Sequence, residues 1–252
     1  MDIEGKKAIV VGGASGMGRA TAEALARGGA QVAILDRESS DGKEVATGIR
    51  GVFTPVDITD FDAAEESLSA AVSEIGGLHI AINTAGGGRV AKTFGRSGPH
   101  DLDLFRQVVD LNLVATFNLN RLQAMHMSAN DPEDDERGVI VNTSSLAAFE
   151  GQIGQVAYAA SKAGIAGSAL VMARDLGPLG IRVVAIAPSL FSTGATASFT
   201  EEQVTPLVKD AAFPKRMGRP AEYAKLALAI VDNPMLNGQC LRLDAGQRFG
   251  PR

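Results

Sequence analysis

The sequence of 252 residues contains a single cysteine, Cys240, and only three histidines, which lie far apart. One cysteine cannot form an intramolecular disulfide, so the sequence does not demand an oxidising compartment. Histidine and cysteine also supply most ligands of zinc, and the sequence has no spacing typical of a metal site. We therefore expect a protein without disulfides and without a bound metal.

Long apolar runs and clusters of basic residues are also missing. The most apolar stretch, around 163–173, contains glycine and serine and is too short to span a bilayer. With 24 basic and 29 acidic residues, the chain has a formal net charge of −5 and lacks the basic stripe that nucleic acids require. Its first residues show no signal-peptide core and no arginine-rich transit segment. We expect a soluble, cytoplasmic protein that binds neither nucleic acid nor a membrane.

What the sequence does contain is a regular alternation of short apolar runs and segments with helical spacing. Continuous apolar runs are typical of strands buried on both faces of a parallel sheet. Their alternation with helices predicts an α/β fold, a Rossmann-like doubly wound parallel sheet of about seven strands. No linker or repeat interrupts it, so a single domain over 1–252 is expected. The expected strands are 7–11, 31–35, 52–56, 78–82, 138–142, 181–186 and 239–243.

Four glycines fall within seven residues, just where the first expected strand gives way to a helix: Gly12, Gly13, Gly16 and Gly18. Glycine permits a tight turn and lets backbone N–H groups approach a pyrophosphate, while a helix N-terminus favours negative charge. Glycines also end strands without binding anything. The spacing G-x-x-x-G-x-G alone therefore leaves a phosphate site and a plain turn equally open.

An acidic residue after the second expected strand favours the phosphate site. Asp36 follows Gly18 by eighteen residues, close to the distance at which a carboxylate binds the adenosine ribose of a dinucleotide. A carboxylate accepts a hydrogen bond from the 2′-hydroxyl and repels a 2′-phosphate. The neighbouring cation, Arg37, would tolerate that phosphate, but the predicted cofactor is NAD.

Tyr158 and Lys162 lie four residues apart in an expected helix, so their side chains share one face. Tyrosine has a reference pKa of about 10 and is a poor acid at neutral pH. A nearby ammonium stabilises the phenolate and lowers that pKa. Ser145 ends an expected strand thirteen residues upstream, where a hydroxyl can hold a substrate carbonyl. As isolated residues, Ser145 and Tyr158 are more often structural than catalytic.

In their order and spacing these motifs resemble the short-chain dehydrogenase/reductase family along essentially the whole chain. The resemblance implies an NAD-dependent oxidoreductase that interconverts a secondary alcohol and a ketone. The matching strings are "GGASGMG" for the cofactor phosphates, "VDI" (56–58) for the adenine, "NTAG" (83–86) beneath the cofactor, "LNL" (111–113) and "YAASK" (158–162).

The same resemblance implies a role for each catalytic residue. Tyr158 is the acid and base, and Lys162 binds the nicotinamide ribose and lowers the pKa of the tyrosine. Ser145 orients the substrate, and Asn112 orders a water in the proton relay. Asparagine is a poor helix former, so a helix kink is the structural alternative for Asn112.

The resemblance also implies a set of contacts along the cleft. Ser145, Gln155 and Tyr158 would contact the substrate, although Gln155 fits the start of a helix equally well. Two positions depart from the family pattern: Val11 replaces a threonine and Ser189 replaces a glycine. The implied cofactor contacts are Gly12, Ser15, Gly16, Met17, Gly18, Asp36, Asp57, Ile58, Asn83, Ala85, Gly86, Tyr158, Lys162, Pro188, Phe191 and Thr193.

Longer strings, such as "FPKRMGRPAEYA" (213–224), resemble the type-2 3-hydroxyacyl-CoA dehydrogenase subfamily. That resemblance implies a 3-hydroxyacyl-CoA or 3-ketoacyl-CoA substrate and a homotetramer. A hydroxysteroid or other small-alcohol dehydrogenase is the alternative enzyme. A non-catalytic NAD-binding module is a third interpretation, for which the four catalytic residues would be superfluous.

Residues 189–219 are expected to form a substrate lid after the sixth strand of the pattern. Its apolar side chains suit an acyl chain and its cations suit CoA phosphates, although each residue alone is more readily explained by packing or solvation. The apolar residues are Leu190, Phe191, Phe199, Leu207 and Phe213, and the cations are Lys209, Lys215 and Arg216.

Overall fold

The computed structural model describes residues 1–96 and 98–251, the side chains of 195 and 197 excepted. Seven parallel strands form one sheet in the order β3-β2-β1-β4-β7-β8-β9, which confirms the predicted doubly wound fold. The strands are β1 Lys7–Val11, β2 Gln31–Asp36, β3 Val52–Pro55, β4 Ile80–Asn83, β7 Gly138–Thr143, β8 Ile181–Pro188 and β9 Cys240–Leu243.

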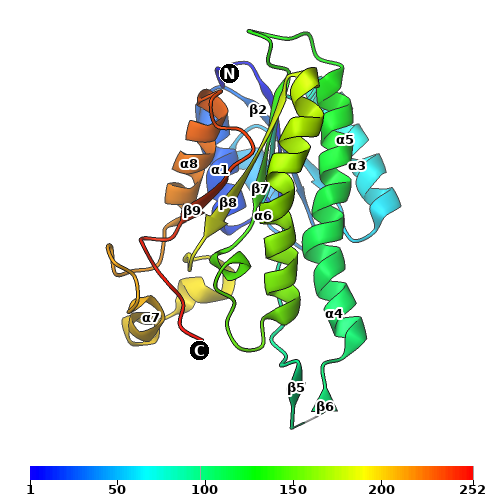
Figure 1. Ribbon diagram of the computed structural model, residues 1–252. Coiled ribbons are helices and arrows are strands. Elements are labelled where there is room, and N and C mark those ends of the chain that lie inside the picture. The colour runs from blue at the N-terminus through cyan, green and yellow to red at the C-terminus, as the bar shows by residue number, and fades with distance from the viewer. Residues whose placement is uncertain (97, 252) are drawn as a thin grey trace.

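Helices cover both faces of this sheet (Figure 1). One layer contains α1 Gly16–Arg27, α2 Gly42–Gly48 and α8 Pro220–Asp232, and the other contains α3 Phe61–Ile75, α4 Leu102–Val109, α5 Ala115–Ser128 and α6 Val156–Leu176. A π-helical turn, Asp110–Val114, joins α4 to α5, and short 3₁₀ turns occupy Leu146–Ala148, Gly177–Leu179 and Gly194–Ser198. Beyond the sheet lie α7 Glu201–Val208 and a small hairpin of β5 Phe94–Gly95 and β6 Gly98–Pro99.

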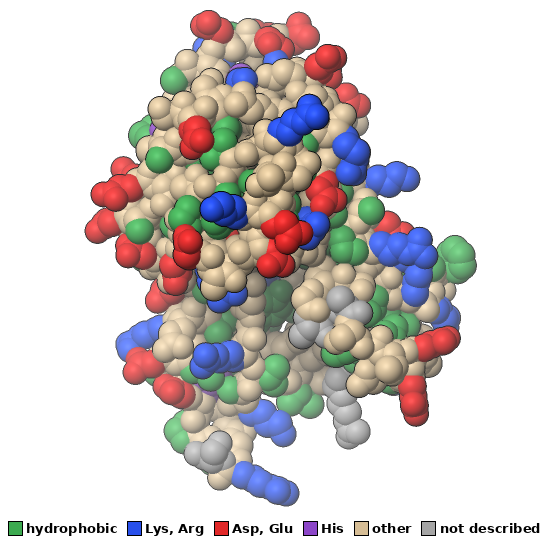
Figure 2. All heavy atoms as spheres, turned by 180° about the vertical axis from the view of Figure 1, so that it is seen from behind, with side chains coloured by type: hydrophobic (Ala, Val, Ile, Leu, Met, Phe, Trp, Pro, Cys, Tyr) green, Lys and Arg blue, Asp and Glu red, His purple; other side chains and the backbone are tan. Residues whose placement is uncertain are grey.

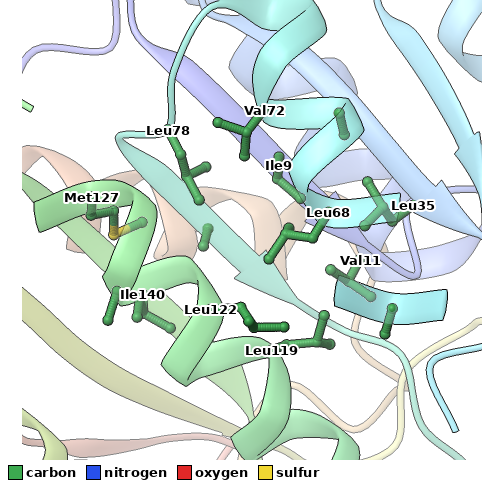
Figure 3. Packing of buried hydrophobic residues seen from close by; sticks show 14 of the residues in the cluster. Ile9, Val11, Leu35, Leu68, Val72, Leu78, Leu119, Leu122, Met127 and Ile140 are labelled. Carbon is green, nitrogen blue, oxygen red and sulfur yellow. The ribbon is translucent and has the colours of Figure 1, made fainter. Parts of the chain in front are cut away.

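The sheet is buried on both faces because its strands are almost wholly apolar. Figure 3 shows one side, where Leu68 of α3 lies near Ile9 of β1, and Leu122 of α5 belongs to the same buried cluster. On the other side, Leu25 of α1 and Ile230 of α8 belong to a second buried cluster. Burying one such side chain contributes about 1.5–3 kcal/mol, so each helix is held mainly by its apolar face.

The order of the strands reverses between β1 and β4, and this places a crevice at their carboxyl ends. The chain runs from β1 outward to β2 and β3, then crosses back to add β4 on the opposite side of β1. In open α/β sheets, ligands bind at this reversal. The hairpin and α7 both project beyond that edge of the sheet. Figure 2 shows that the surface is hollowed between these two projecting parts.

Helix α6 corrects the expectation that no segment is long and apolar enough to cross a bilayer. Among the described residues, Val156–Leu179 passes that test by length and composition, with 24 residues and a mean hydropathy of 1.3. In the fold, its Ile165 and Ala169 pack against Ala185 of β8. One face of the segment therefore packs on the sheet, and 39% of its most apolar window is buried inside the protein.

Candidate active site

The glycine-rich turn between β1 and α1 needs glycine at several positions. Gly12 and Gly16 have φ angles of +79° and +51°, which side chains disfavour. A Cβ on Gly12 would lie 2.6 Å from the amide nitrogen of Ala85, and one on Gly18 would overlap the carbonyl oxygen of Gly12. The turn therefore packs backbone against backbone, and the free N–H groups at the start of α1 border the crevice.

Two carboxylates are fixed at the ends of neighbouring strands. Asp36 accepts hydrogen bonds from the backbone nitrogens of Ala14, at 3.0 Å, and Arg37, at 2.8 Å. Asp57 accepts from the hydroxyl and the backbone nitrogen of Thr59, and these bonds lower the pKa of Asp57 below its usual value. Both carboxylates border the same cleft as the glycine turn.

Tyr158, Lys162 and Ser145 converge at the carboxyl end of β7. Lys162 lies over the ring of Tyr158, with Nζ 5.5 Å from the ring centroid, as expected for neighbours four residues apart in α6. Nζ donates a 2.9 Å hydrogen bond to the carbonyl oxygen of Thr143, the last residue of β7. Burial raises the pKa of Tyr158, and a hydrogen bond with Ser145 acts in the opposite direction.

The direction of that pKa shift corrects one expectation. The spacing predicted that the ammonium of Lys162 would lower the pKa of Tyr158, but in this structure burial dominates and raises it. Burial also lowers the pKa of Lys162 to about 8, because the ammonium loses its hydration inside the protein. Lys162 therefore stays mostly protonated at neutral pH and titrates only slightly above it.

We expect this burial to make the stability of the protein rise with pH. Between about 8 and 10.5, the unfolded chain keeps a proton on Lys162 that the folded protein has released, so the free energy of unfolding increases with pH in that window. Relative to a Lys162→Met variant, the wild type should gain up to about 3 kcal/mol across it. Urea unfolding of both proteins from pH 7 to 10.5 measures the difference, and a constant difference would contradict the buried charge.

Asn112 lies in the π-helical turn and holds the chain that leaves β4. Its Nδ2 donates to the carbonyl oxygen of Gly87 at 2.6 Å, and its Oδ1 accepts from the backbone nitrogen of Gly87 at 3.1 Å. A Cβ on Gly86 would lie 2.7 Å from that Oδ1 and 3.2 Å from Nζ of Lys162. Asn112 of the π turn therefore lies next to both the loop after β4 and Lys162. Such turns are frequent at functional sites.

Asn83, at the end of β4, belongs to a cluster of buried amides. Its Nδ2 lies within 3.0 Å of side-chain oxygens of Asn120, Gln123 and Asn142, and Nε2 of Gln123 donates back at 2.8 Å. The cluster joins β4, β7 and α5 directly below the crevice. Asn83 therefore lies beneath the cleft, and its amide forms hydrogen bonds with other buried side chains.

The crevice is a cleft of about 1000 Å³ that gathers most of the predicted site residues. Three of them do not border it: Asn83 and Asn112 are buried behind it, and Oε1 of Gln155 accepts from the backbone nitrogen of Gln152 just before α6. The predicted residues along its wall are Gly12, Ser15, Gly16, Met17, Gly18, Asp36, Asp57, Ile58, Ala85, Gly86, Ser145, Tyr158, Lys162, Pro188, Phe191 and Thr193.

Several residues of the cleft escaped the sequence analysis. Thr59, Gly87 and Ser144 directly follow or precede predicted contacts, so adjacency was a signal for them. Gln107 of α4 and Asp110 of the π turn also border the cleft, and no motif in the sequence pointed to them. Within residues 1–96 and 98–251, no group of three His, Cys, Asp or Glu side chains is arranged to hold a metal ion.

Part of the segment 189–219 borders the cleft, and its large apolar side chains differ in burial. Phe191 is buried and packs on Gly218, whereas Phe213 is 84% exposed. The guanidinium of Arg216 is engaged by both carboxylate oxygens of Glu222, at 2.6 and 2.9 Å. Arg216 thus forms an ion pair at the surface, while Nζ of Lys215 donates to the carbonyl oxygen of Lys209 at 3.3 Å.

The cleft thus brings together a glycine turn and a carboxylate at a sheet crossover with a tyrosine, a lysine and a serine. The short chain dehydrogenase family matches residues 6–204, and the chain belongs to this family. Three features fit a nicotinamide dinucleotide: the backbone cradle at Gly12 and Gly18, the N-terminus of α1, and the carboxylate of Asp36 held in place by the glycine turn.

Within the family, the chain is similar to type-2 3-hydroxyacyl-CoA dehydrogenases. It is 48% identical to the one from Drosophila melanogaster over 99% of this chain and 100% of the relative. The crystal structure of the one from Mycobacterium avium has a TM-score of 0.94 and 40% identity, covering 98% of both chains. A 7α-hydroxysteroid dehydrogenase complexed with NADH and 7-oxo glycochenodeoxycholic acid has a TM-score of 0.89 and 29% identity, covering 99% and 97%.

Proposed function

We propose that this oxidoreductase interconverts 3-hydroxyacyl-CoA and 3-ketoacyl-CoA with NAD(H). The observation that supports it best is the convergence of Tyr158, Lys162 and Ser145 at the edge of the cleft, in a chain so similar to type-2 3-hydroxyacyl-CoA dehydrogenases. When bound, the nicotinamide supplies the acceptor or donor of hydride. The chain's own residues bind the substrate and move the proton.

Tyr158 is the proposed acid and base. In oxidation, the hydroxyl proton of the substrate passes to the phenolate oxygen as the carbinol carbon loses hydride and becomes a carbonyl. In reduction, the phenol returns that proton to the oxygen of the new alcohol. A half-buried phenol beside an ammonium suits this role, because the ammonium stabilises the phenolate that each cycle forms.

The other three catalytic residues would position the cofactor, the substrate and the proton relay around Tyr158. Lys162 would bind the ribose next to the nicotinamide through ammonium hydrogens not given to Thr143. The hydroxyl of Ser145 would hold the substrate oxygen beside Tyr158. Asn112 would complete the relay from its place in the π turn, where its amide already fixes Gly87.

NAD is the proposed form of the cofactor because Asp36 ends β2 with its carboxylate held in place by the glycine turn. We expect wild-type kcat/KM to favour NAD over NADP and Asp36→Ala to narrow that preference by about 1–3 kcal/mol, roughly 5- to 150-fold. Asp36→Asn is the matched control, since it keeps one acceptor oxygen for the backbone nitrogen of Ala14 and replaces the other oxygen, together with the charge, by an amide donor. Equal wild-type efficiency with both cofactors would contradict the proposal and make Arg37 decisive.

The remaining cofactor contacts follow the cleft from end to end. We assign Asp57 and Ile58 to the adenine, the glycine turn to the phosphates, and Pro188 and Thr193 to the nicotinamide. Their support is that all of them border one continuous cleft. Ala85, Gly86 and Phe191 would line its floor and wall, with Asn83 below them.

The substrate would enter between the hairpin and the proposed lid, residues 189–219 of the single domain. Gln155, just before α6, is the proposed contact of the acyl group near its reacting carbon, for which its side chain would leave Gln152 and turn towards the cleft. Lys209 and Lys215 remain for the CoA phosphates, because Arg216 is already paired with Glu222.

A panel of three ketones tests this function: acetoacetyl-CoA, free acetoacetate and an androgen-type steroid ketone, each read by NADH absorbance. We expect the thioester to have the highest kcat/KM, since CoA contacts contribute to transition-state binding. Equal values for the free acid would remove the CoA assignment. Turnover of the steroid alone would favour the hydroxysteroid alternative, which the likeness to the 7α-hydroxysteroid dehydrogenase supports. No turnover of any ketone would leave a nucleotide-binding module.

We also propose that the protein is a homotetramer and that a second copy covers the outer faces of α5 and α6. Three apolar side chains on these helices are each more than half exposed: Phe117, Met125 and Val171. Exposed apolar side chains that gather on one face favour association. Val171→Asp is expected to reduce the mass measured by light scattering, and Val90→Asp, at an exposed apolar residue before the hairpin, is the control. A wild-type monomer at micromolar concentration would contradict the proposal.

A further inference from the structure

Tyr223 is a fully buried tyrosine on the side of the sheet opposite the catalytic helix. It belongs to α8, whose other buried residues are Ala224, Ala227, Ile230 and Val231, all apolar. A hydroxyl in such surroundings costs free energy unless it is hydrogen-bonded. Its oxygen lies 2.7 Å from the hydroxyl oxygen of Thr143, so the hydroxyl is satisfied at the end of β7.

The direction of this hydrogen bond follows from the count of protons. Thr143 has one hydroxyl proton, and it donates that proton to the carbonyl oxygen of Asn83 at 2.7 Å. Tyr223 must therefore be the donor to Thr143. Burial raises the pKa of Tyr223 above its ordinary value, so the phenol keeps the proton that it donates. The chain of donors runs from α8 through β7 to β4.

Both strand ends joined in this way carry the catalytic site. The carbonyl oxygen of Thr143 accepts the hydrogen bond from Nζ of Lys162, and the next residues of the chain are Ser144 and Ser145. On the other strand, Asn83 is followed by Thr84, Ala85 and Gly86, of which the last comes close to the lysine.

We propose that the hydroxyl of Tyr223 is a positioning group that fixes the carboxyl ends of β4 and β7, and through the carbonyl of Thr143 orients Lys162. The inference rests on the proposed function in one respect, the catalytic role of Lys162. Tyr223 does not border the cleft and touches neither reactant. A phenylalanine would fill the same space, so the hydroxyl is the part of the residue that this role requires.

Tyr223→Phe tests the role with two independent measurements. We expect kcat to fall about tenfold while KM for the ketone changes less than about twofold, as for a lost transition-state interaction. Without substrate or cofactor, NMR of ¹³C-labelled lysines should show that the pKa of Lys162 falls by about half a pH unit. The reason is that a more mobile carbonyl group of Thr143 stabilises the ammonium less. Tyr158 on the same helix lies beside Lys162, Asp110 of the π turn lines the same cleft, and Cys240 of β9 pairs with Ser144, whose hydroxyl donates to the backbone carbonyl of Lys162; the variant leaves all three in place.

Ile230→Val is the matched control on the same helix. It removes one buried methylene from the same apolar cluster, so it should lower Tm while leaving kcat and the titration of Lys162 at wild-type values. Thr143→Val removes the acceptor for Tyr223, and the double variant Thr143→Val with Tyr223→Phe should have the kcat of Thr143→Val alone.

Each outcome decides the inference. A lower Tm for Tyr223→Phe, with both kcat and the Lys162 titration unchanged, would overturn it and leave the tyrosine a packing residue. Multiplicative losses in the double variant would also overturn it, since the two groups would then act separately. If the wild type reduced no ketone in the panel, the proposed function would fall, but the titration would still test Tyr223 because it needs neither substrate nor cofactor.

Discussion

Replacement of Tyr158 by phenylalanine is expected to lower kcat by about 10²- to 10⁴-fold, the usual contribution of general acid–base catalysis. The ring, which contacts the chain at Gly88 and lies beneath Nζ of Lys162, would stay in place. Only the hydroxyl that exchanges a proton with the substrate would be lost. Steady-state reduction of acetoacetyl-CoA measures the loss, and NADH binding by fluorescence should remain within a few-fold of the wild type.

Ser168→Ala is the matched control for Tyr158→Phe. It removes another hydroxyl of α6, one that donates only to the backbone carbonyl of Ile165, and should leave kcat unchanged. Near-normal turnover by Tyr158→Phe would mean that another group exchanges the proton. A parallel loss of NADH binding would mean that the variant had disturbed the cleft and not the chemistry.

Gly18→Ala should have the second largest effect, on cofactor binding. The added Cβ would overlap the carbonyl oxygen of Gly12 and press on the hydroxyl of Thr84, so the turn must move away from the geometry that holds a pyrophosphate. Overpacking of this kind costs about 1–3 kcal/mol, which predicts NADH binding weaker by roughly 5- to 150-fold. Fluorescence titration of NADH measures the change.

Gly167→Ala provides the comparison, because nothing lies within 4 Å of the Cβ that it would add in α6. It should bind NADH like the wild type and unfold at a slightly higher temperature, since glycine is unfavourable inside a helix. If Gly18→Ala bound NADH as tightly as Gly167→Ala, the backbone cradle at Gly18 would not be the phosphate site.

Local sequence patterns predicted those features that depend on neighbours along the chain. The seven apolar runs became the seven strands of the sheet, with ends within a few residues of the expected ones. Tyr158 and Lys162 share a helix face because four residues make about one turn. Gly12, Gly16 and Asp36 meet because a strand–turn–helix unit and the next parallel strand place them together.

Features that depend on contacts between distant segments were not predicted. The β5–β6 hairpin and the π turn at Asn112 leave no periodic signal in the sequence. The raised pKa of Tyr158 depends on burial by several elements, which a four-residue spacing does not reveal. The pairing of Arg216 with Glu222 was not predicted either, because the fold sets a cation's partner.

The buried amides beneath the cleft have a consequence for how uniquely the chain folds. Apolar side chains tolerate many nearly equivalent arrangements, but an amide needs partners in fixed directions. If β4 were displaced against β7, Asn83 would lose its alignment with Asn142, and each unpaired group would cost about 1–3 kcal/mol. The cluster thus discriminates against misfolded arrangements that hydrophobic burial alone would accept. Leucine at these positions would keep the protein compact but weaken this discrimination between the correct and the displaced pairing of β4 with β7.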